Sequence, residues 1–238
     1  MKLTYIYHSG YVIEGDNYAI IIDYYKDSGG VNGIVHEEIL RKKGRLYVLC
    51  THSHHDHFNP EILGWKLVNP DIRYIFSKDI LDNKQAGAKD AYYLDKLDGY
   101  EDDILTIKAY GSTDLGVSFL IKVGGKVIFH AGDLNNWHWN EESTPEEILE
   151  AETYYLSELN LLAKDVDYID LAMFPVDPRL GKDYMKGAEQ FIDKIKTGIF
   201  VPMHFGEAYD KAAAFERYAN AADIKFVGWK QKGESINF

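Results

Sequence analysis

The most informative segment of the chain is Thr51-His52-Ser53-His54-His55-Asp56-His57. It directly follows the apolar run Leu46-Tyr47-Val48-Leu49-Cys50, which is typical of a buried strand. Four of the nine histidines of the chain lie in this segment, and imidazole and carboxylate groups are costly to bury without partners. A divalent metal is such a partner. The segment therefore predicts a metal centre at the end of a strand.

The spacing of the segment suits metal ligation. His52 and His54 are two residues apart just past a strand, so their side chains can project in the same direction. Asp56 and His57 lie in the turn beyond, within reach of a second cation. Nitrogen and carboxylate donors suit zinc, manganese or iron, and the single cysteine, Cys50, excludes a structural four-thiolate site. The alternative is an accidental, solvated histidine-rich loop, and the strand-to-loop context favours ligation.

The composition predicts one soluble, cytoplasmic domain over residues 1–238. A chain of 238 residues with 46% hydrophobic content can bury a substantial core. Its one cysteine allows no intrachain disulfide, which suits a reducing compartment. Residues 1–8 alternate like a strand and lack the apolar core of a signal segment. No apolar run approaches the ~20 residues of a membrane span.

The charge of the chain argues against two classes of partner. The formal net charge of −12 would repel a phosphate backbone, and no stripe of lysine or arginine is interleaved with aromatic residues. We therefore expect no nucleic-acid partner and no membrane partner. A small molecule is the expected substrate, and a homo-oligomer is kept open beside a monomer.

Strand-like and helix-like segments alternate in both halves of the chain. The predicted strands are 2–7, 11–14, 18–23, 46–50, 72–76, 104–109, 117–123, 127–130, 169–175, 199–203 and 224–229, and the predicted helices are 33–43, 145–162, 184–195 and 211–221. Strands 117–123 and 127–130 are expected to form a hairpin across Gly124-Gly125. Thr144 is the expected N-cap of the helix that begins at Pro145. This order predicts an α/β fold with two sheets between helical layers. The hairpin-rich first half argues against a barrel of eight β/α units.

The segment at 51–57 resembles the signature of the metallo-β-lactamase superfamily. That signature, Thr-His-x-His-x-Asp-His after a strand, is met here by Thr51, His52, His54, Asp56 and His57. The resemblance extends along nearly the whole chain. The compact length and the opening Tyr7-His8-Ser9-Gly10 are most similar to the branch of small-metabolite hydrolases that includes ascorbate-6-phosphate lactonase. The resemblance implies a four-layer αββα sandwich.

The resemblance also implies site residues at three later strand ends. Asp23 matches an aspartate that supports the metal loop, Asp133 matches a carboxylate that bridges two metals, and His204 matches the last metal-binding histidine. Taken singly, each has a structural alternative, because aspartate often forms turns and a lone histidine is often a satisfied structural group. Their order and their place at strand ends favour a shared pocket.

One family ligand is missing. The family usually supplies another histidine in the segment that here reads Tyr110-Gly111-Ser112-Thr113-Asp114-Leu115-Gly116. Asp114 can substitute, which would favour manganese or iron over zinc. His138 is the other candidate, and we slightly favour it because it is close in sequence to Asp133.

Substrate contacts are predicted from two loops. Trp137 and His138 follow the bridging aspartate, and Asp177 and Arg179 follow a strand that should end on the same face. The alternatives are packing of a surface loop for Trp137 and a surface salt bridge for Arg179.

The expected function is hydrolysis by a metal-activated water. Zinc is the first choice of metal, with one or two ions per chain, and Asp56 is both a ligand and a proton acceptor. The expected substrate is a small polar metabolite, such as a lactone, an ester or a phosphodiester. Two alternatives remain: an iron-dependent oxidoreductase of the same fold and a non-catalytic metal or ligand sensor.

Overall fold

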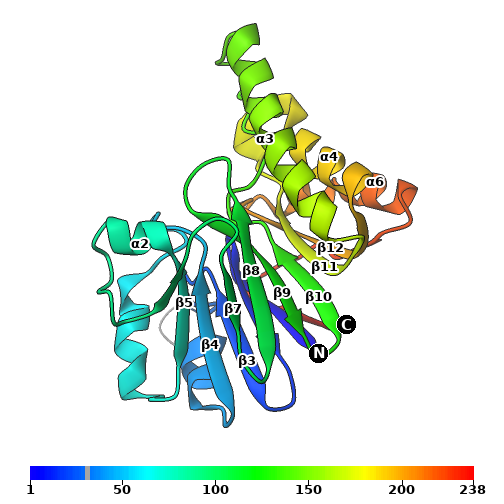
Figure 1. Ribbon diagram of the computed structural model, residues 1–238. Coiled ribbons are helices and arrows are strands. Elements are labelled where there is room, and N and C mark those ends of the chain that lie inside the picture. Colours follow the sequence, from blue (N-terminus) through cyan, green and yellow to red (C-terminus); the bar gives the residue numbers. More distant parts are fainter. Residues whose placement is uncertain (30–32) are drawn as a thin grey trace. The chain divides into compact units, whose positions relative to one another are not determined.

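This computed structural model describes residues 1–29 and 33–238 and contains two seven-stranded sheets (Figure 1). The contacts between residues divide the chain into two units. The first comprises Met1–Asp95 and Trp229–Phe238, and the second comprises Lys96–Gly228. The predicted α/β class with two sheets is confirmed. The predicted single domain over 1–238 stays a prediction.

The sheet of the first unit has the strand order β14-β1-β2-β3-β4-β5-β6. Its strands are β1 (Lys2–Tyr7), β2 (Gly10–Glu14), β3 (Tyr18–Ile22), β4 (Arg45–Cys50), β5 (Arg73–Ser77), β6 (Tyr92–Leu94) and β14 (Ser235–Asn237). Pairs from β14 to β3 are antiparallel, and pairs from β3 to β6 are parallel. Ile22 pairs with Leu49, so β3 and β4 end at the same edge of the sheet. That edge carries Asp23 and the segment 51–57.

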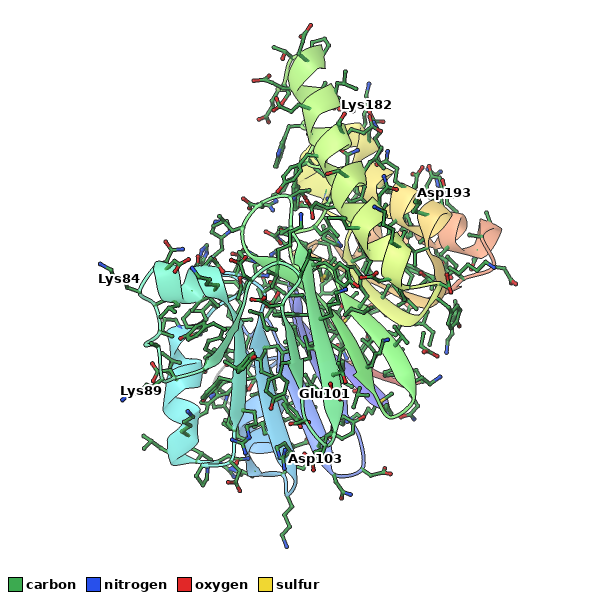
Figure 2. The ribbon with its side chains drawn as sticks, viewed as in Figure 1. Lys84, Lys89, Glu101, Asp103, Lys182 and Asp193 are labelled. Atoms are coloured by element: carbon green, nitrogen blue, oxygen red, sulfur yellow. The ribbon has the colours of Figure 1, made fainter. Side chains whose placement is uncertain are left out.

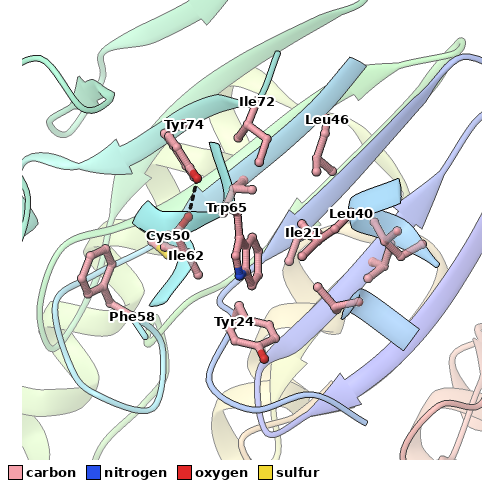
Figure 3. Close-up of a cluster of buried hydrophobic side chains, with 14 of the residues drawn as sticks. Ile21, Tyr24, Leu40, Leu46, Cys50, Phe58, Ile62, Trp65, Ile72 and Tyr74 are labelled. Carbon is pink, nitrogen blue, oxygen red and sulfur yellow. Dashed lines mark hydrogen bonds between the residues drawn. The ribbon is translucent and has the colours of Figure 1, made fainter. Parts of the chain in front are cut away.

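One face of this sheet is covered by short helices. These are α1 (Ile34–Glu37), the 3₁₀ helices η2 (Ile39–Arg41) and η3 (Pro60–Leu67), and α2 (Lys78–Asp82). Figure 3 shows Trp65 and Ile62 of η3 among the buried side chains of this core. Each such side chain contributes about 1.5–3 kcal/mol when it leaves water. Leu46, Val48 and Cys50 of β4 belong to the same core.

The sheet of the second unit has the order β13-β12-β11-β10-β9-β8-β7. Its strands are β7 (Gly99–Glu101), β8 (Leu105–Gly111), β9 (Val117–Val123), β10 (Lys126–His130), β11 (Tyr168–Pro175), β12 (Lys196–Met203) and β13 (Lys225–Phe226). The predicted hairpin between β9 and β10 is confirmed, and Gly124 and Gly125 supply the two positive φ angles that its tight turn needs. From β10 to β13 the pairs are parallel, so β10, β11 and β12 present their carboxyl ends at one edge.

The helices of the second unit agree only in part with the helices predicted from the sequence. They are α3 (Pro145–Asp165), the 3₁₀ helix η4 (Pro178–Asp183), α4 (Lys186–Lys194), α5 (Tyr209–Ala213) and α6 (Glu216–Ala221). Thr144 caps α3 as predicted, in a capping box with Glu147, and Pro145 is its first residue. The helix predicted over 211–221 is instead divided into α5 and α6.

Charged side chains occupy the outside of each unit (Figure 2). Lys84 and Lys89 are exposed in the first unit, and Glu101, Lys182 and Asp193 are exposed in the second. This distribution is what a chain of high net charge needs to remain hydrated. No helix within residues 1–29 and 33–238 combines the length and the apolar character needed to cross a bilayer.

Candidate metal centre

Asp23 anchors the start of the histidine segment. It is fully buried and follows β3 with a left-handed backbone, φ 48°, which aspartate tolerates better than most residues. Its N–H donates to the carbonyl oxygen of Leu49 at 2.9 Å. Its Oδ1 accepts the N–H of Thr51 at 2.8 Å, and its Oδ2 accepts the hydroxyl of Thr51 at 2.7 Å. The carboxylate therefore joins the ends of β3 and β4.

Asp23 also orients His57. The Nδ1 atom of His57 lies 2.7 Å from Oδ2 of Asp23, and both side chains are fully buried. Because an ionised carboxylate only accepts hydrogen bonds, Nδ1 carries the proton and Nε2 keeps its lone pair in the neutral ring. This is the contact expected of a residue that supports a metal ligand.

Thr51 determines which ring nitrogen of His52 carries the proton, as Asp23 does for His57. The Oγ1 atom of Thr51 lies 3.1 Å from Nδ1 of His52. The single hydroxyl hydrogen is already donated to Asp23, so Oγ1 accepts from Nδ1–H, which leaves the lone pair on Nε2. The rings of His52 and His57 lie 4.0 Å apart between centroids. One buried carboxylate thus sets the tautomer of two neighbouring imidazoles, a role for Thr51 that sequence reasoning missed.

Replacing Thr51 tests this relay. Thr51→Val keeps the branched shape but removes the acceptor for Nδ1–H of His52, so we expect metal affinity to fall by about 10- to 100-fold. Thr51→Ser retains the hydroxyl and should stay within about threefold of the parent protein. Competition with a chromophoric chelator measures the affinity, and ¹⁵N NMR of the metal-free protein reports the tautomer of His52. An unchanged tautomer and affinity in Thr51→Val would exclude the relay.

Ser53 holds the segment from its other side. Its N–H donates to Oδ2 of Asp79 at 2.8 Å, its hydroxyl accepts from Asn83 at 2.9 Å, and its carbonyl oxygen accepts from Gln85 at 2.9 Å. These partners belong to α2 and to the residues just after it. The segment is therefore tied to the sheet by Asp23 and to the α2 region by Ser53.

Asp56 and His54 are the more accessible candidate ligands. His54 is exposed, and its ring centroid lies 4.8 Å from that of His52. Oδ2 of the half-buried Asp56 lies 3.3 Å from Nε2 of His8. Burial raises the pKa of Asp56, but the hydrogen bond from His8 leads the contributions that outweigh burial and hold this pKa well below its usual range. The carboxylate is therefore ionised, as a metal ligand must be.

His8 is a further residue that sequence reasoning did not assign to the site. It lies in the turn between β1 and β2, with φ 58°. Ligand atoms of His8, Asp56 and His57 lie within 4.8 Å of one another. A single histidine in a predicted hairpin carries no signal of such a contact, because the pairing of β1, β2 and β3 brings it there.

In the second unit, three candidate residues follow three parallel strands. Asp133 comes after β10, Asp177 after β11 and His204 after β12. Nδ1 of His204 lies 2.9 Å from Oδ2 of Asp177, and its Nε2 lies 3.3 Å from Oδ1 of Asp133. All three are buried. The contact with Asp177 places the proton of His204 on Nδ1, the tautomer that Asp23 gives to His57.

Asp177 contacts both His204 and Arg179. Its side chain is 1% exposed and binds His204 together with the main-chain N–H and guanidinium of Arg179. Burial raises the pKa of Asp177, but the hydrogen bonds from His204 and Arg179 outweigh burial and hold this pKa well below its usual range. Its carboxylate therefore orients His204, and the expected contact of Asp177 with substrate stays a prediction. Arg179 forms an ion pair with Asp177, and a salt bridge was the alternative to a substrate contact for Arg179.

The loop after β10 is tied to the segment that lacks the family histidine. The hydroxyl of Thr113 donates to the carbonyl oxygen of Asn135 at 2.6 Å and accepts the N–H of Asn135 at 2.9 Å. Carboxylate oxygens of Asp114 and Asp133 lie within 4.8 Å of each other. Asp114 therefore lies near the predicted bridging carboxylate.

His138 is held by the main chain. Its Nε2 donates to the carbonyl oxygen of Asp183 at 3.1 Å, and its Nδ1 accepts the N–H of Asn140 at 3.2 Å. A ring with both nitrogens bonded in this way offers no lone pair to a metal. These contacts favour Asp114 over His138 as the further donor, and the roles expected of His138 stay predictions.

Trp137 packs within the same loop. Its Nε1–H donates to the carbonyl oxygen of Asp133 at 2.8 Å, and its ring lies 5.5 Å from that of His204 in an edge-on arrangement. It thus braces two candidate ligands. Its half-buried ring keeps a part that can contact substrate.

The chain is similar to known metal-dependent hydrolases in sequence and in fold. A family model described as beta-lactamase superfamily domain matches residues 2–149. The metal-dependent hydrolase YtkL of Bacillus subtilis is 23% identical over 227 residues, which cover 86% of each chain. A metal-dependent hydrolase of Pyrococcus furiosus is 24% identical over 255 residues, which cover 99% of each chain. Igni18, a metallo hydrolase of Ignicoccus hospitalis, has a similar fold, with a TM-score of 0.69 and 18% identity over 100% of this chain and 97% of that chain.

Proposed function

We propose, since this chain belongs to the beta-lactamase superfamily, that it hydrolyses a small polar metabolite by means of a metal-activated water. The chain is a metal-dependent hydrolase, as its relatives are named. One observation carries the proposal: the buried carboxylate of Asp23 sets the tautomers of both His52 and His57. Packing does not require two imidazoles whose Nε2 atoms keep their lone pairs, whereas metal ligation requires such lone pairs.

The proposed ligands are those that the sequence predicts. In the first unit they are His52, His54, Asp56 and His57, and in the second unit they are Asp133 and His204, with Asp114 as a further donor. Nitrogen and carboxylate donors fit zinc, manganese or iron, and a third carboxylate shifts the preference from zinc toward manganese or iron. Asp23, Thr51 and Asp177 support the histidines. One or two ions per chain are compatible with this set.

The roles of the residues follow from their contacts. When bound, the metal supplies a water of lowered pKa and polarises an electrophilic oxygen of the substrate. The ionised carboxylate of Asp56 can accept a proton at Oδ2, where Nε2 of His8 lies at 3.3 Å. Trp137 and Arg179 remain the proposed substrate contacts. The proposed substrates are lactones, esters and phosphodiesters.

Metal analysis combined with a substrate panel tests the proposal. Protein purified without added metal should contain a divalent metal and hydrolyse at least one lactone, ester or phosphodiester. Chelation should remove this turnover, and addition of the metal should restore it. Iron with colour but no hydrolysis would favour the oxidoreductase alternative, and bound metal without any turnover would favour the sensor.

Asp114 and His138 give opposite predictions. Asp114→Ala should lower the bound metal, because an exposed carboxylate near Asp133 is lost from the proposed ligand set. His138→Ala should leave the metal content unchanged and destabilise the fold by about 1–3 kcal/mol, because the partners of a buried ring are left unsatisfied.

Elemental analysis and thermal unfolding separate the two effects. Asp103→Ala is the matched control, because Asp103 is also an exposed carboxylate of the second unit. A loss of metal in His138→Ala but not in Asp114→Ala would restore the role that the sequence alone favoured for His138.

A further inference from the structure

The link from β8 to β9 begins with Ser112, Thr113 and Asp114 and lies at the same edge of the sheet as Asp133. The link follows the carboxyl end of β8, and Asp133 follows the carboxyl end of β10. Both strands are antiparallel to β9, which lies between them, so β8 and β10 end at one edge. Carboxylate oxygens of Asp114 and Asp133 accordingly lie within 4.8 Å of each other.

The hydroxyl of Thr113 joins the two segments that carry these carboxylates. It donates to the carbonyl oxygen of Asn135 at 2.6 Å and accepts the N–H of Asn135 at 2.9 Å. The carbonyl oxygen of Asp133 lies 3.2 Å from the same hydroxyl. Thr113 directly precedes Asp114, and Asn135 comes two residues after Asp133. One side chain therefore fixes the main chain beside Asp114 relative to the main chain beside Asp133.

Helix α3 holds the same link from another side. The hydroxyl of Tyr154 donates to the carbonyl oxygen of Ser112 at 3.0 Å, and the Oγ atom of Ser112 accepts the N–H of Asp114 at 3.3 Å. A Cβ atom at Gly111 would lie 2.1 Å from Oε2 of Glu158, so α3 packs directly against the last residue of β8. The main chain that carries Asp114 is thus ordered by hydrogen bonds and by packing, as a preorganised ligand requires.

We propose that Thr113 is a positioning residue that sets the metal preference of the centre, because it holds Asp114 beside Asp133. The inference rests on the proposed function, in which Asp114 is a further donor. Carboxylate oxygens suit manganese, whereas imidazole nitrogens suit zinc. The hydroxyl of Thr113 keeps an additional carboxylate in place for the metal. Without this hydroxyl, the affinity for manganese falls more than the affinity for zinc.

Metal competition on the metal-free protein tests this role without any need for turnover. Mn²⁺ and Zn²⁺ are each titrated against a chromophoric chelator. Thr113→Val keeps the branched shape but removes the hydroxyl, so it should lower the manganese affinity by about tenfold or more and the zinc affinity by about threefold or less. Thr113→Ser retains the hydroxyl and should restore both affinities. Asp114→His should raise the zinc affinity relative to the manganese affinity by about tenfold.

A double variant separates positioning from a general loss of stability. If Thr113 acts through Asp114, Thr113→Val combined with Asp114→Ala should bind manganese no more weakly than Asp114→Ala alone. Thr197→Val is the matched control. The hydroxyl of Thr197 also bonds to the main chain of the second unit, at the carbonyl oxygen of Ile195, but it lies at the amino end of β12, whereas His204 follows the carboxyl end. Thr197→Val should keep the parent preference between the two metals.

The results that would overturn the proposal are specific. It fails if Thr113→Val keeps the parent manganese affinity, if both metals lose affinity equally, if Thr113→Ser restores nothing, or if the losses in the double variant add. Parent manganese affinity in Asp114→Ala would overturn it together with the proposed role of Asp114. If the variants bind metal as expected but the metal-loaded parent protein hydrolyses nothing, the positioning role stands and the proposed function does not.

Discussion

Asp23→Asn is expected to lower metal affinity by about 100-fold or more, because two candidate ligands depend on one carboxylate. Oδ2 of Asp23 accepts from both the hydroxyl of Thr51 and Nδ1 of His57. An asparagine has one acceptor oxygen, so its NH2 group would face either both of these donors or the N–H of Thr51, which now donates to Oδ1. The loss should exceed that of Thr51→Val, which disturbs His52 alone. Competition with a chelator provides the measurement.

Two controls give this result a specific meaning. Asp165→Asn changes an exposed carboxylate that bonds to Tyr110 and should keep the parent affinity. Asp177→Asn removes the corresponding support from His204 only, so its effect should be smaller than that of Asp23→Asn. The circular dichroism spectrum of each variant must match that of the parent. Parent affinity in a folded Asp23→Asn protein would contradict the shared role of this carboxylate.

His54→Ala and Asp56→Ala are each expected to abolish turnover and remove most of the bound metal, while the fold stays largely intact. His54 is exposed and Asp56 is half-buried, so neither contributes much to the core. Ligands at the end of a strand contribute to the site more than to the packing. Turnover, metal content per chain and thermal unfolding measure the three parts of this prediction.

His55→Ala is the closest control for these variants. His55 lies between the two ligands in sequence, its side chain is 84% exposed, and it has no place in the proposed ligand set. Its replacement should leave the metal content unchanged. Normal metal and turnover in His54→Ala and Asp56→Ala would remove the histidine segment from the metal centre.

The parts of the site that could be predicted share a local signal. The segment 51–57 is dense in histidine directly after an apolar strand, and Asp23, Asp133 and His204 each end an apolar strand. Such signals can be recognised in the sequence alone, because the end of an apolar strand is marked by the residues that follow it. The α/β class follows from the same alternation of strands and helices.

The parts that could not be predicted depend on strand register or on distant pairing. Asp177 meets His204 because β11 and β12 are parallel and in register, and nothing local to Asp177 indicates that contact. His138 is close to Asp133 in sequence, but the loop turns its ring to the main chain of Asp183. Only Lys225–Phe226 of the strand predicted over 224–229 forms a strand, β13. A further strand, β14, follows it and pairs with β1.

The pairing of β14 with β1 also sets an order of events during synthesis. The first unit is discontinuous. Its residues 1–95 leave the ribosome before the second unit, whereas β14 and Trp229, which donates to the hydroxyl of Tyr11, leave only after residue 228. The second unit is continuous from residue 96 to residue 228. It can therefore finish folding while the first sheet still lacks an edge strand. The nascent chain must keep β1 exposed throughout that interval, which is when an unpaired edge is most open to a chaperone or to another chain.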